Sequence, residues 1–76
     1  MIKSITETGE WQQVNHYTVE FLEAIVWNLE NSACYEYQIV NLDTGSILAQ
    51  SDVEYGNPVS ALRDALNHAF DIVEQV

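Results

Sequence analysis

The clearest pattern of apolar and polar positions lies in the last third of the chain. Between residues 58 and 74 apolar side chains recur every three or four positions, and polar side chains occupy the opposite side of a helical wheel. Asn57 followed by Pro58 is typical of a helix N-cap and a first helical residue, where the missing N–H of proline costs nothing. The pattern predicts an amphipathic helix over about 58–74. Its apolar side comprises Val59, Ala61, Leu62, Ala65, Leu66, Ala69, Phe70, Ile72 and Val73.

Alternation of apolar and polar positions precedes this helix. Residues 35–42 alternate in this way, and a second apolar run begins after a short loop. In the loop, Asp43 can open a type I turn, and Gly45 can take the left-handed position that follows it. We therefore expect a β-hairpin with strands at about 35–42 and 46–54.

The first half of the chain allows two interpretations. Over residues 18–31 the apolar side chains fill one half of a helical wheel and the glutamates fill most of the other half, with Thr18 in the N-cap position. This pattern predicts a second helix. Over residues 17–22 apolar and polar positions also alternate, so a strand remains an alternative there.

A short hairpin is expected before this second helix, because residues 2–5 and 11–14 flank Gly9. The Thr-Gly pair of that turn lies 36 residues before the Thr-Gly pair of the later hairpin, which indicates either an internal duplication or shared turn chemistry. The predicted fold is α+β, with two layers. An antiparallel sheet of about four strands, in the order ββαββα, carries both helices on one face. At 76 residues the chain makes a single domain, 1–76.

Charge restricts what such a domain can bind. Twelve Asp and Glu residues stand against one lysine, Lys3, and one arginine, Arg63, which gives a net charge of −10. Phosphate binding needs several basic contacts, so this balance excludes direct binding of nucleic acid and of anionic membranes. The chain has no apolar stretch long enough for a membrane span and no signal-peptide pattern, and we expect a cytoplasmic location. Cys34 is the only cysteine and is expected to be a small buried apolar residue.

One short motif carries a resemblance to a known family. The sequence Val-Asn-Leu-Asp-Thr-Gly-Ser over residues 40–46 resembles the active-site signature of aspartic proteases, in which hydrophobic residues precede Asp-Thr-Gly. In that family two such aspartates share a proton and activate a water, so the resemblance implies that Asp43 is the catalytic acid and base of a homodimer. Asp-Thr-Gly is also the sequence that a bulged hairpin turn favours. We expect the structural turn, and no enzyme activity.

A metal site is the second candidate chemistry. Asp64, His68 and Asp71 fall at i−4, i and i+3 on the polar side of the C-terminal helix, so their side chains could converge on one ion. The same spacing is also typical of a solvated helix face. We expect the solvated face, and neither a metal nor a cofactor.

One aromatic residue, Trp27, bears on function. On the wheel of residues 18–31, Trp27 falls among the glutamates, away from the apolar half. Tryptophan often anchors protein interfaces, and acidic residues attract a basic partner. The sequence therefore predicts a partner-binding surface made by Glu20, Glu23, Trp27 and Glu30. The alternative is that Trp27 packs within its own domain.

Together these features predict a small acidic protein-interaction domain that binds a basic protein surface. Small phage-encoded inhibitors are similar in size and acidity, so a sharper form is an inhibitor that occludes a nucleic-acid-binding site. Duplex DNA carries ~17 charges over the ~30 Å width of such a domain, so DNA mimicry requires that the acids gather on one side. The alternative function is a homo-oligomeric structural or regulatory subunit, held through an apolar patch, an open sheet edge or Trp27.

Overall fold

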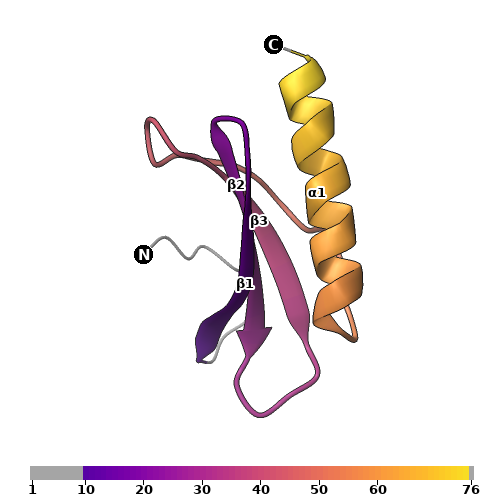
Figure 1. The fold of residues 1–76 in the computed structure, drawn as a ribbon. Coiled ribbons are helices and arrows are strands. Elements are labelled where there is room, and N and C mark those ends of the chain that lie inside the picture. The colour runs from indigo at the N-terminus through magenta and orange to yellow at the C-terminus, as the bar shows by residue number, and fades with distance from the viewer. Residues whose placement is uncertain (1–9, 76) are drawn as a thin grey trace.

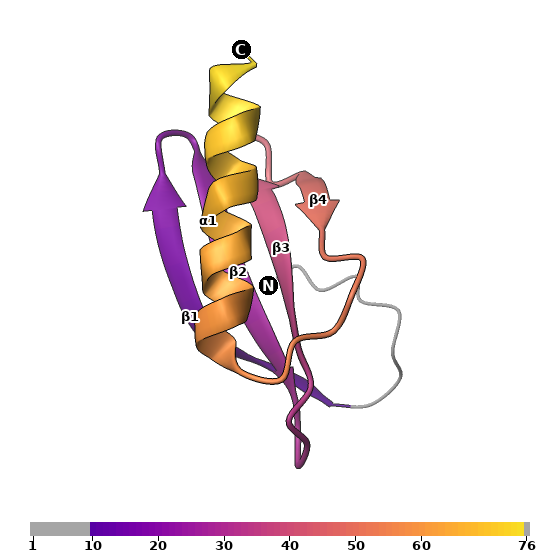
Figure 2. The same cartoon turned by 90° about the vertical axis from the view of Figure 1, so that its right-hand side faces the viewer.

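The computed structural model describes residues 10–75, in which four strands are followed by one helix. The elements are β1 (Trp11–Val19), β2 (Leu22–Leu29), β3 (Tyr35–Asn41), β4 (Ile47–Gln50) and α1 (Pro58–Glu74). The strands form one antiparallel sheet in the order β1-β2-β3-β4, and α1 packs on one of its faces (Figures 1 and 2). The α+β prediction is confirmed, whereas the element order is ββββα and not ββαββα.

The predicted helix over residues 18–31 is wrong. This stretch contains the end of β1, a tight turn at Glu20 and Phe21, and all of β2. Glu20 has a φ of 56°, the left-handed conformation that two-residue hairpin turns use. Most of β2 is buried on both faces of the sheet, so its apolar residues form a nearly continuous run. Such a run fits a helical wheel as well as a strand, and tertiary packing decides for the strand.

The remaining expectations for the first half also change. Residues 11–14 begin β1, and the first three of them pair with β2 while Val14 lies at a bulge. Residues 2–5 lie outside the described part of the chain. The alternation over residues 17–22 does indicate a strand, but only as far as Val19. A repeated ββα unit would need a helix before residue 35. Because β2 takes that place, the duplication finds no support.

The second hairpin is confirmed, with a return strand shorter than the predicted 46–54. Asn41 Oδ1 accepts hydrogen bonds from the backbone N–H of Asp43 and Thr44, at 2.8 and 3.2 Å. The N–H of Gly45 donates to the Asn41 carbonyl at 2.7 Å, and its φ is 78°. Glycine adopts this left-handed conformation without strain, so turn chemistry accounts for Gly45. The residue that opens the turn is Asn41, and not Asp43 as the sequence predicts.

The C-terminal helix is confirmed with the predicted bounds. Asn57 has extended backbone angles and its Oδ1 accepts the N–H of Ser60 at 2.8 Å, and Pro58 occupies the first turn. At the other end, the N–H of Gln75 donates to the carbonyl of Ile72 at 3.1 Å. Within residues 10–75, no helix is long and apolar enough to cross a membrane.

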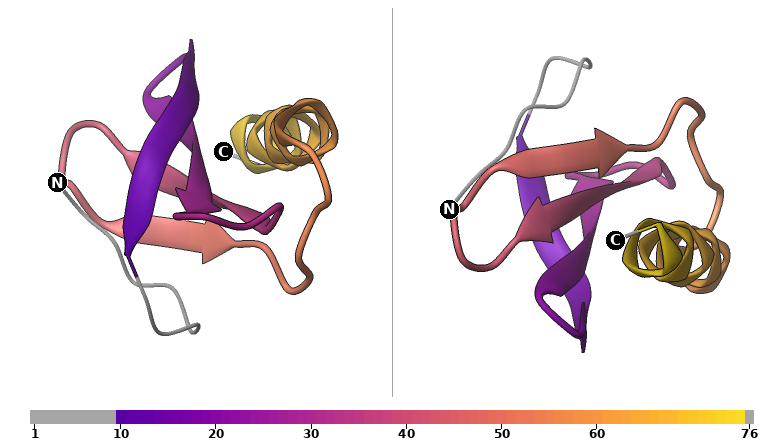
Figure 3. Two further views of the ribbon diagram at one scale, coloured as in Figure 1. Left: turned by 90° about the horizontal axis from the view of Figure 1, so that it is seen from below. Right: turned by 90° about the horizontal axis from the view of Figure 1, so that it is seen from above.

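Apolar clusters lie on both faces of the sheet. Under α1, side chains of β1, β2 and β3 pack against three fully buried alanines, Ala61, Ala65 and Ala69. The opposite face carries a second cluster: Trp11, Ile25, Trp27, Cys34 and Val40, with Leu29 and Ile47 at its border. The end-on views show α1 against one side of the twisted sheet (Figure 3).

The apolar side of α1 is wider than the surface that it buries. Alanine has a small side chain, so the helix backbone approaches the sheet closely along its alanines. The larger residues predicted for the buried side lie beside this line. Val59 is 74% exposed and Phe70 is 50% exposed.

Candidate functional site

Trp27 is buried, so the expectation of an exposed tryptophan anchor is wrong. It lies in β2, on the face opposite α1, and has no solvent-accessible surface. Its indole Nε1–H donates to Oε1 of Gln38 in β3 at 3.0 Å, and Gln38 is itself fully buried. The other amide atom, Gln38 Nε2, has no hydrogen-bond partner among the described residues. Trp27 therefore packs within its own domain, as the alternative interpretation holds.

The three glutamates predicted to surround Trp27 do not converge. Glu20 and Glu30 stand at opposite ends of β2, about 30 Å apart at ~3.3 Å per strand residue. Glu23 is half-buried, and its Oε2 lies 3.3 Å from Nδ1 of His16 on the neighbouring strand. Binding of a partner by these carboxylates stays a prediction, but they do not form one surface.

Acidic residues from three separate segments gather at one end of the molecule. The β1–β2 turn and the β3–β4 turn are joined by a hydrogen bond from the Leu42 N–H to the Phe21 carbonyl, at 2.9 Å. The C-terminal end of α1 lies at the same end of the molecule (Figure 1). We call this region the acidic end. It comprises Glu20, Glu23, Asp43, Asp71 and Glu74, of which all but Glu23 are exposed.

The acidic end holds nearly half of the carboxylates of the described residues and none of their lysines or arginines. Of the twelve acids, all but Glu7 lie within residues 10–75, and five of these eleven belong to the acidic end. The last turn of α1 contains no basic residue, so the negative pole of the helix dipole adds to the carboxylates. Arg63, the one arginine or lysine in the described part, lies in the first half of α1.

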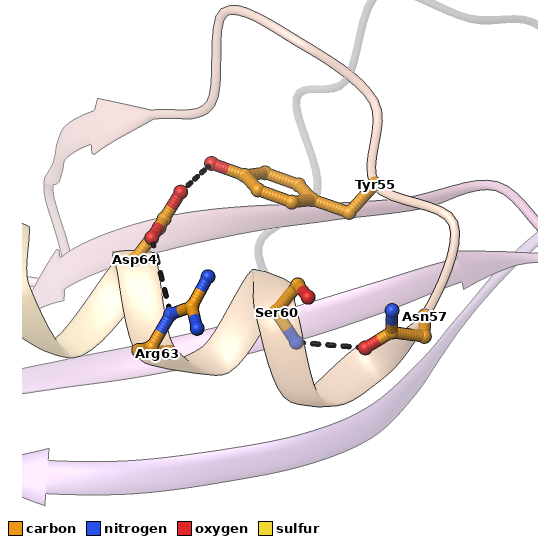
Figure 4. Close-up of polar contacts among 5 residues, drawn as sticks. All are labelled: Tyr55, Asn57, Ser60, Arg63 and Asp64. Atoms are coloured by element: carbon orange, nitrogen blue, oxygen red, sulfur yellow. Dashed lines mark hydrogen bonds and ion pairs between the residues drawn. The ribbon is translucent and has the colours of Figure 1, made fainter.

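Polar side chains also join α1 to the sheet on the β3 side. The Tyr55 hydroxyl donates to Asp64 Oδ2 at 2.8 Å, and Nε of Arg63 lies 3.8 Å from Oδ1 of the same carboxylate (Figure 4). The Tyr37 hydroxyl lies 3.0 Å from Nδ1 of His68, and the two rings meet edge to face at 5.9 Å. These contacts hold the helix against the sheet.

The three residues predicted to converge on a metal ion are used differently. Asp64 and His68 form hydrogen bonds to tyrosines, and Asp71 is exposed at the acidic end. Within residues 10–75 these three do not form a group with metal-ligand spacing.

Burial and charge keep both tyrosines protonated. Burial, followed by the hydrogen bond to Asp64 and the charge of Asp64, raises the pKa of Tyr55 from 10.0 to about 12. Burial, followed by the carboxylates of Asp64 and Asp52, raises the pKa of Tyr37. A general acid or base works best with a pKa near the working pH, so these shifts suit structural donors better than catalytic groups.

A different group of possible metal ligands lies on the face opposite α1. One ligand atom each of Cys34, Glu36 and Glu54 lies within 4.8 Å of the other two. Cys34 and Glu36 are buried, and the Cys34 thiol donates to Glu54 Oε2 at 2.9 Å. One sulfur and two carboxylates combine soft and hard donors, which select no particular metal. The hydrogen bond between thiol and carboxylate accounts for the approach of Cys34 and Glu54 without an ion.

Asp43, the residue that resembles a protease aspartate, is exposed in the β3–β4 turn. Its backbone N–H is held by Asn41, and Thr44 Oγ1 accepts the N–H of Ser46 at 3.2 Å. Comparisons of the chain with family models, with curated proteins and with solved structures find no match. Functional inference therefore rests on the geometry and charge of the described residues.

Sequence reasoning did not find the main side-chain contacts of this structure. Cys34 and Glu54 are 20 residues apart, and Tyr37 and His68 are 31 residues apart. Each pair is brought together by packing of distant segments, so no local spacing could reveal it. The sequence does not predict the acidic end either, because its members come from β2, two turns and the last turns of a helix.

Proposed function

We propose that this chain is a non-catalytic protein-interaction domain whose acidic end binds a basic protein surface. The observation that carries the proposal is that the β1–β2 turn, the β3–β4 turn and the C-terminal end of α1 lie at one end of the molecule (Figure 1). Their exposed acids are Glu20, Asp43, Asp71 and Glu74, and the described residues of this end include no lysine or arginine. Clustered charge of one sign raises the local potential and steers an oppositely charged partner into contact.

The number of charges bears on the kind of partner. The five acids of the acidic end are few beside the ~17 charges that duplex DNA carries over about 30 Å. A compact basic patch is therefore a better match than a long nucleic-acid channel. Occlusion of a nucleic-acid-binding site, the sharper form of the proposal, would involve a short part of such a channel. Competition between this chain and a short duplex for a basic partner tests that form.

Matched charge variants test the proposal with an oligolysine peptide as the probe. One triple variant removes charge from the acidic end: Glu20→Gln, Asp43→Asn and Glu74→Gln. The control triple variant removes the same charge from exposed acids elsewhere: Glu10→Gln, Glu30→Gln and Asp52→Asn. Calorimetry is expected to show that the first variant binds the peptide about tenfold more weakly than the control, and that binding of the wild type falls with salt.

Two outcomes would contradict this proposal. Equal weakening by both triple variants would mean that binding follows net charge and not the acidic end. Binding that does not respond to salt would remove the electrostatic argument. Because the control variant contains Glu30, the same comparison tests whether Glu30 belongs to the binding surface.

A cytoplasmic location is part of this proposal, and cell fractionation tests it. A homo-oligomeric subunit is the second candidate function. It is favoured by a separate observation, an edge of the sheet that no described strand covers, on the same side as exposed apolar residues of α1.

A further inference from the structure

The two edges of the sheet differ in length and protection. β4 has four residues, and such a short strand offers little backbone for pairing with another chain. β1 has nine residues, and residues 12–18 are all exposed. No strand within residues 10–75 pairs with the outer side of β1, which contains neither proline nor lysine. A bulge between Gln13 and Asn15 is its one irregularity. Among the described residues, the part of β1 from residue 12 to residue 19 is therefore an open edge.

Exposed apolar side chains lie on the same side of the molecule. Seven large apolar residues are exposed in the described part of the chain, and four of them belong to β1 and α1: Val14, Tyr17, Val59 and Phe70. Tyr17 is 57% exposed. It lies opposite the buried Ala24 in β2, and directly paired residues share a face, so Tyr17 is on the face that α1 covers.

The exposed apolar residues of α1 lie toward β1. Asp64 and His68 contact tyrosines on the β3 side of the helix, and Ala65 faces the sheet. Since β1 and β3 lie on either side of β2, the opposite flank of α1 is the β1 side (Figure 2). We call the apolar residues of this side the helix flank: Val59, Leu62, Leu66, Phe70 and Val73.

The helix flank is symmetric about Leu66. Leu62 and Phe70 lie four residues to either side, and Val59 and Val73 lie seven residues to either side. Around a two-fold axis, residue i of one copy meets residue j of the other, and j meets i. Two antiparallel copies of the flank can therefore place Leu66 on Leu66, Leu62 on Phe70 and Val59 on Val73.

Charge also favours contact along β1. The strand contains no acidic, lysine or arginine residue, although the chain has a net charge of −10. Two copies that meet here bring no carboxylates of β1 together, whereas contact through the acidic end would be repulsive.

The available area is sufficient for a specific contact. β1 spans about 30 Å at ~3.3 Å per residue, and the two shorter extents of the molecule are 22 and 18 Å. Taken as about 30 Å long and about 20 Å wide, this side offers at most roughly 600 Å² for each copy and about 1,200 Å² in total, at the lower limit of specific interfaces.

We infer that a second copy of this chain occupies this side of the molecule. β1 pairs antiparallel with β1 of the second copy, and the two helix flanks pack against each other over the joined sheet. The dimer thus has one continuous sheet with both helices on the same face. Because the interface is small, dimerisation is reversible and depends on concentration. This inference does not use the acidic end, so it stands or falls separately from the proposed function.

Sedimentation equilibrium with lysine variants tests the dimer. Tyr17→Lys and Phe70→Lys put a charge into the interface, and each is expected to raise the dimer Kd by about tenfold or more. Leu48→Lys in β4 and Val53→Lys after it are matched controls, because they also replace exposed apolar residues but lie away from β1. All four variants lower the net negative charge equally, so a weaker dimer cannot result from added repulsion.

Salt and hydrogen exchange give independent measurements. Salt screens the repulsion between two chains of −10 charge and should strengthen the dimer, while it weakens peptide binding at the acidic end. In the wild type, protection of the amides of residues 12–18 should rise with protein concentration, and that of Ile47–Gln50 should not. A chain that stays monomeric at high concentration and high salt would overturn the inference. Equal weakening by the Leu48 and Val53 variants would overturn it as well.

Discussion

The two faces of the sheet are covered by different kinds of side chain. On one face α1 contributes small alanines, and its polar contacts, such as that from Tyr55 to Asp64, lie at the edge of the packed surface. On the other face the bulky Trp27 is fully buried, and its indole is hydrogen-bonded to Gln38 within an apolar cluster. The first face therefore depends on close approach of two backbones, and the second depends on a large side chain and its buried polar partner.

The largest effect is expected on the face with the buried tryptophan. Trp27→Ala removes a fully buried side chain and leaves a cavity, so it should lower the free energy of unfolding by about 3–5 kcal/mol. Urea denaturation followed by circular dichroism measures this loss. Val53→Ala, at a position 60% exposed, is the control and should change stability by less than about 0.5 kcal/mol. A loss for Trp27→Ala no larger than that of the control would show that this face is not closed by Trp27.

On the helix face, increased volume should be the damaging change. Ala65 is fully buried between α1 and the sheet, so Ala65→Leu should overpack the contact and cost about 1–3 kcal/mol. Asn67→Leu introduces the same side chain on the exposed side of the same helix and is expected to have little effect. If thermal denaturation found the two variants equally stable, α1 would not approach the sheet as closely as its alanines indicate.

Loss of the buried polar partner should have an intermediate effect. Gln38→Leu leaves the Trp27 indole N–H without an acceptor, which should cost about 1–2 kcal/mol, because removal of the unpartnered Nε2 offsets part of the loss. Gln50→Leu, at the residue paired with Gln38 in β4, is the control. An unfolding free energy for Gln38→Leu at or above the wild-type value would show that the indole hydrogen bond does not stabilise the fold.

The smallest effect concerns the polar edge of the helix face and depends on pH. Tyr55 has a folded pKa of about 12, above its ordinary value of 10.0, so folding favours the neutral form. Its contribution to stability is complete below pH 10 and is lost as the pH rises from 10 toward 12. Between about pH 10 and 12, the free energy of unfolding should fall less steeply with pH for Tyr55→Phe than for the wild type. Equal slopes for the two proteins would show that the pKa of Tyr55 is the same in the folded and unfolded chains, and would contradict the prediction.

Elements with local signals were predictable, and elements defined by burial on two sides were not. Asn57, Pro58 and a one-sided apolar pattern locate α1 correctly, and the residues around Gly45 locate the turn of the second hairpin. The sequence of β2 fits a helix as well as a strand because both of its faces are buried, which removes the alternation by which a strand is recognised.

The error in β2 carried over to the candidate site. On a helical wheel Trp27 lies among glutamates, but in β2 only Glu23 shares its face, four residues away, and Trp27 packs into the apolar cluster opposite α1. The acidic end could not be predicted either, because two turns and the end of α1 come to the same end of the molecule only once the meander and the helix have formed.

The order of the strands also shapes how the chain folds. Each strand pairs with the next one along the sequence, so the sheet can form hairpin by hairpin through the closure of short loops. The contacts of α1 with β1 join the two ends of the described chain and carry the greatest sequence separation. We therefore expect a transition state in which the central hairpin of β2 and β3 is formed while α1 is still undocked, with unfolding beginning by release of the helix.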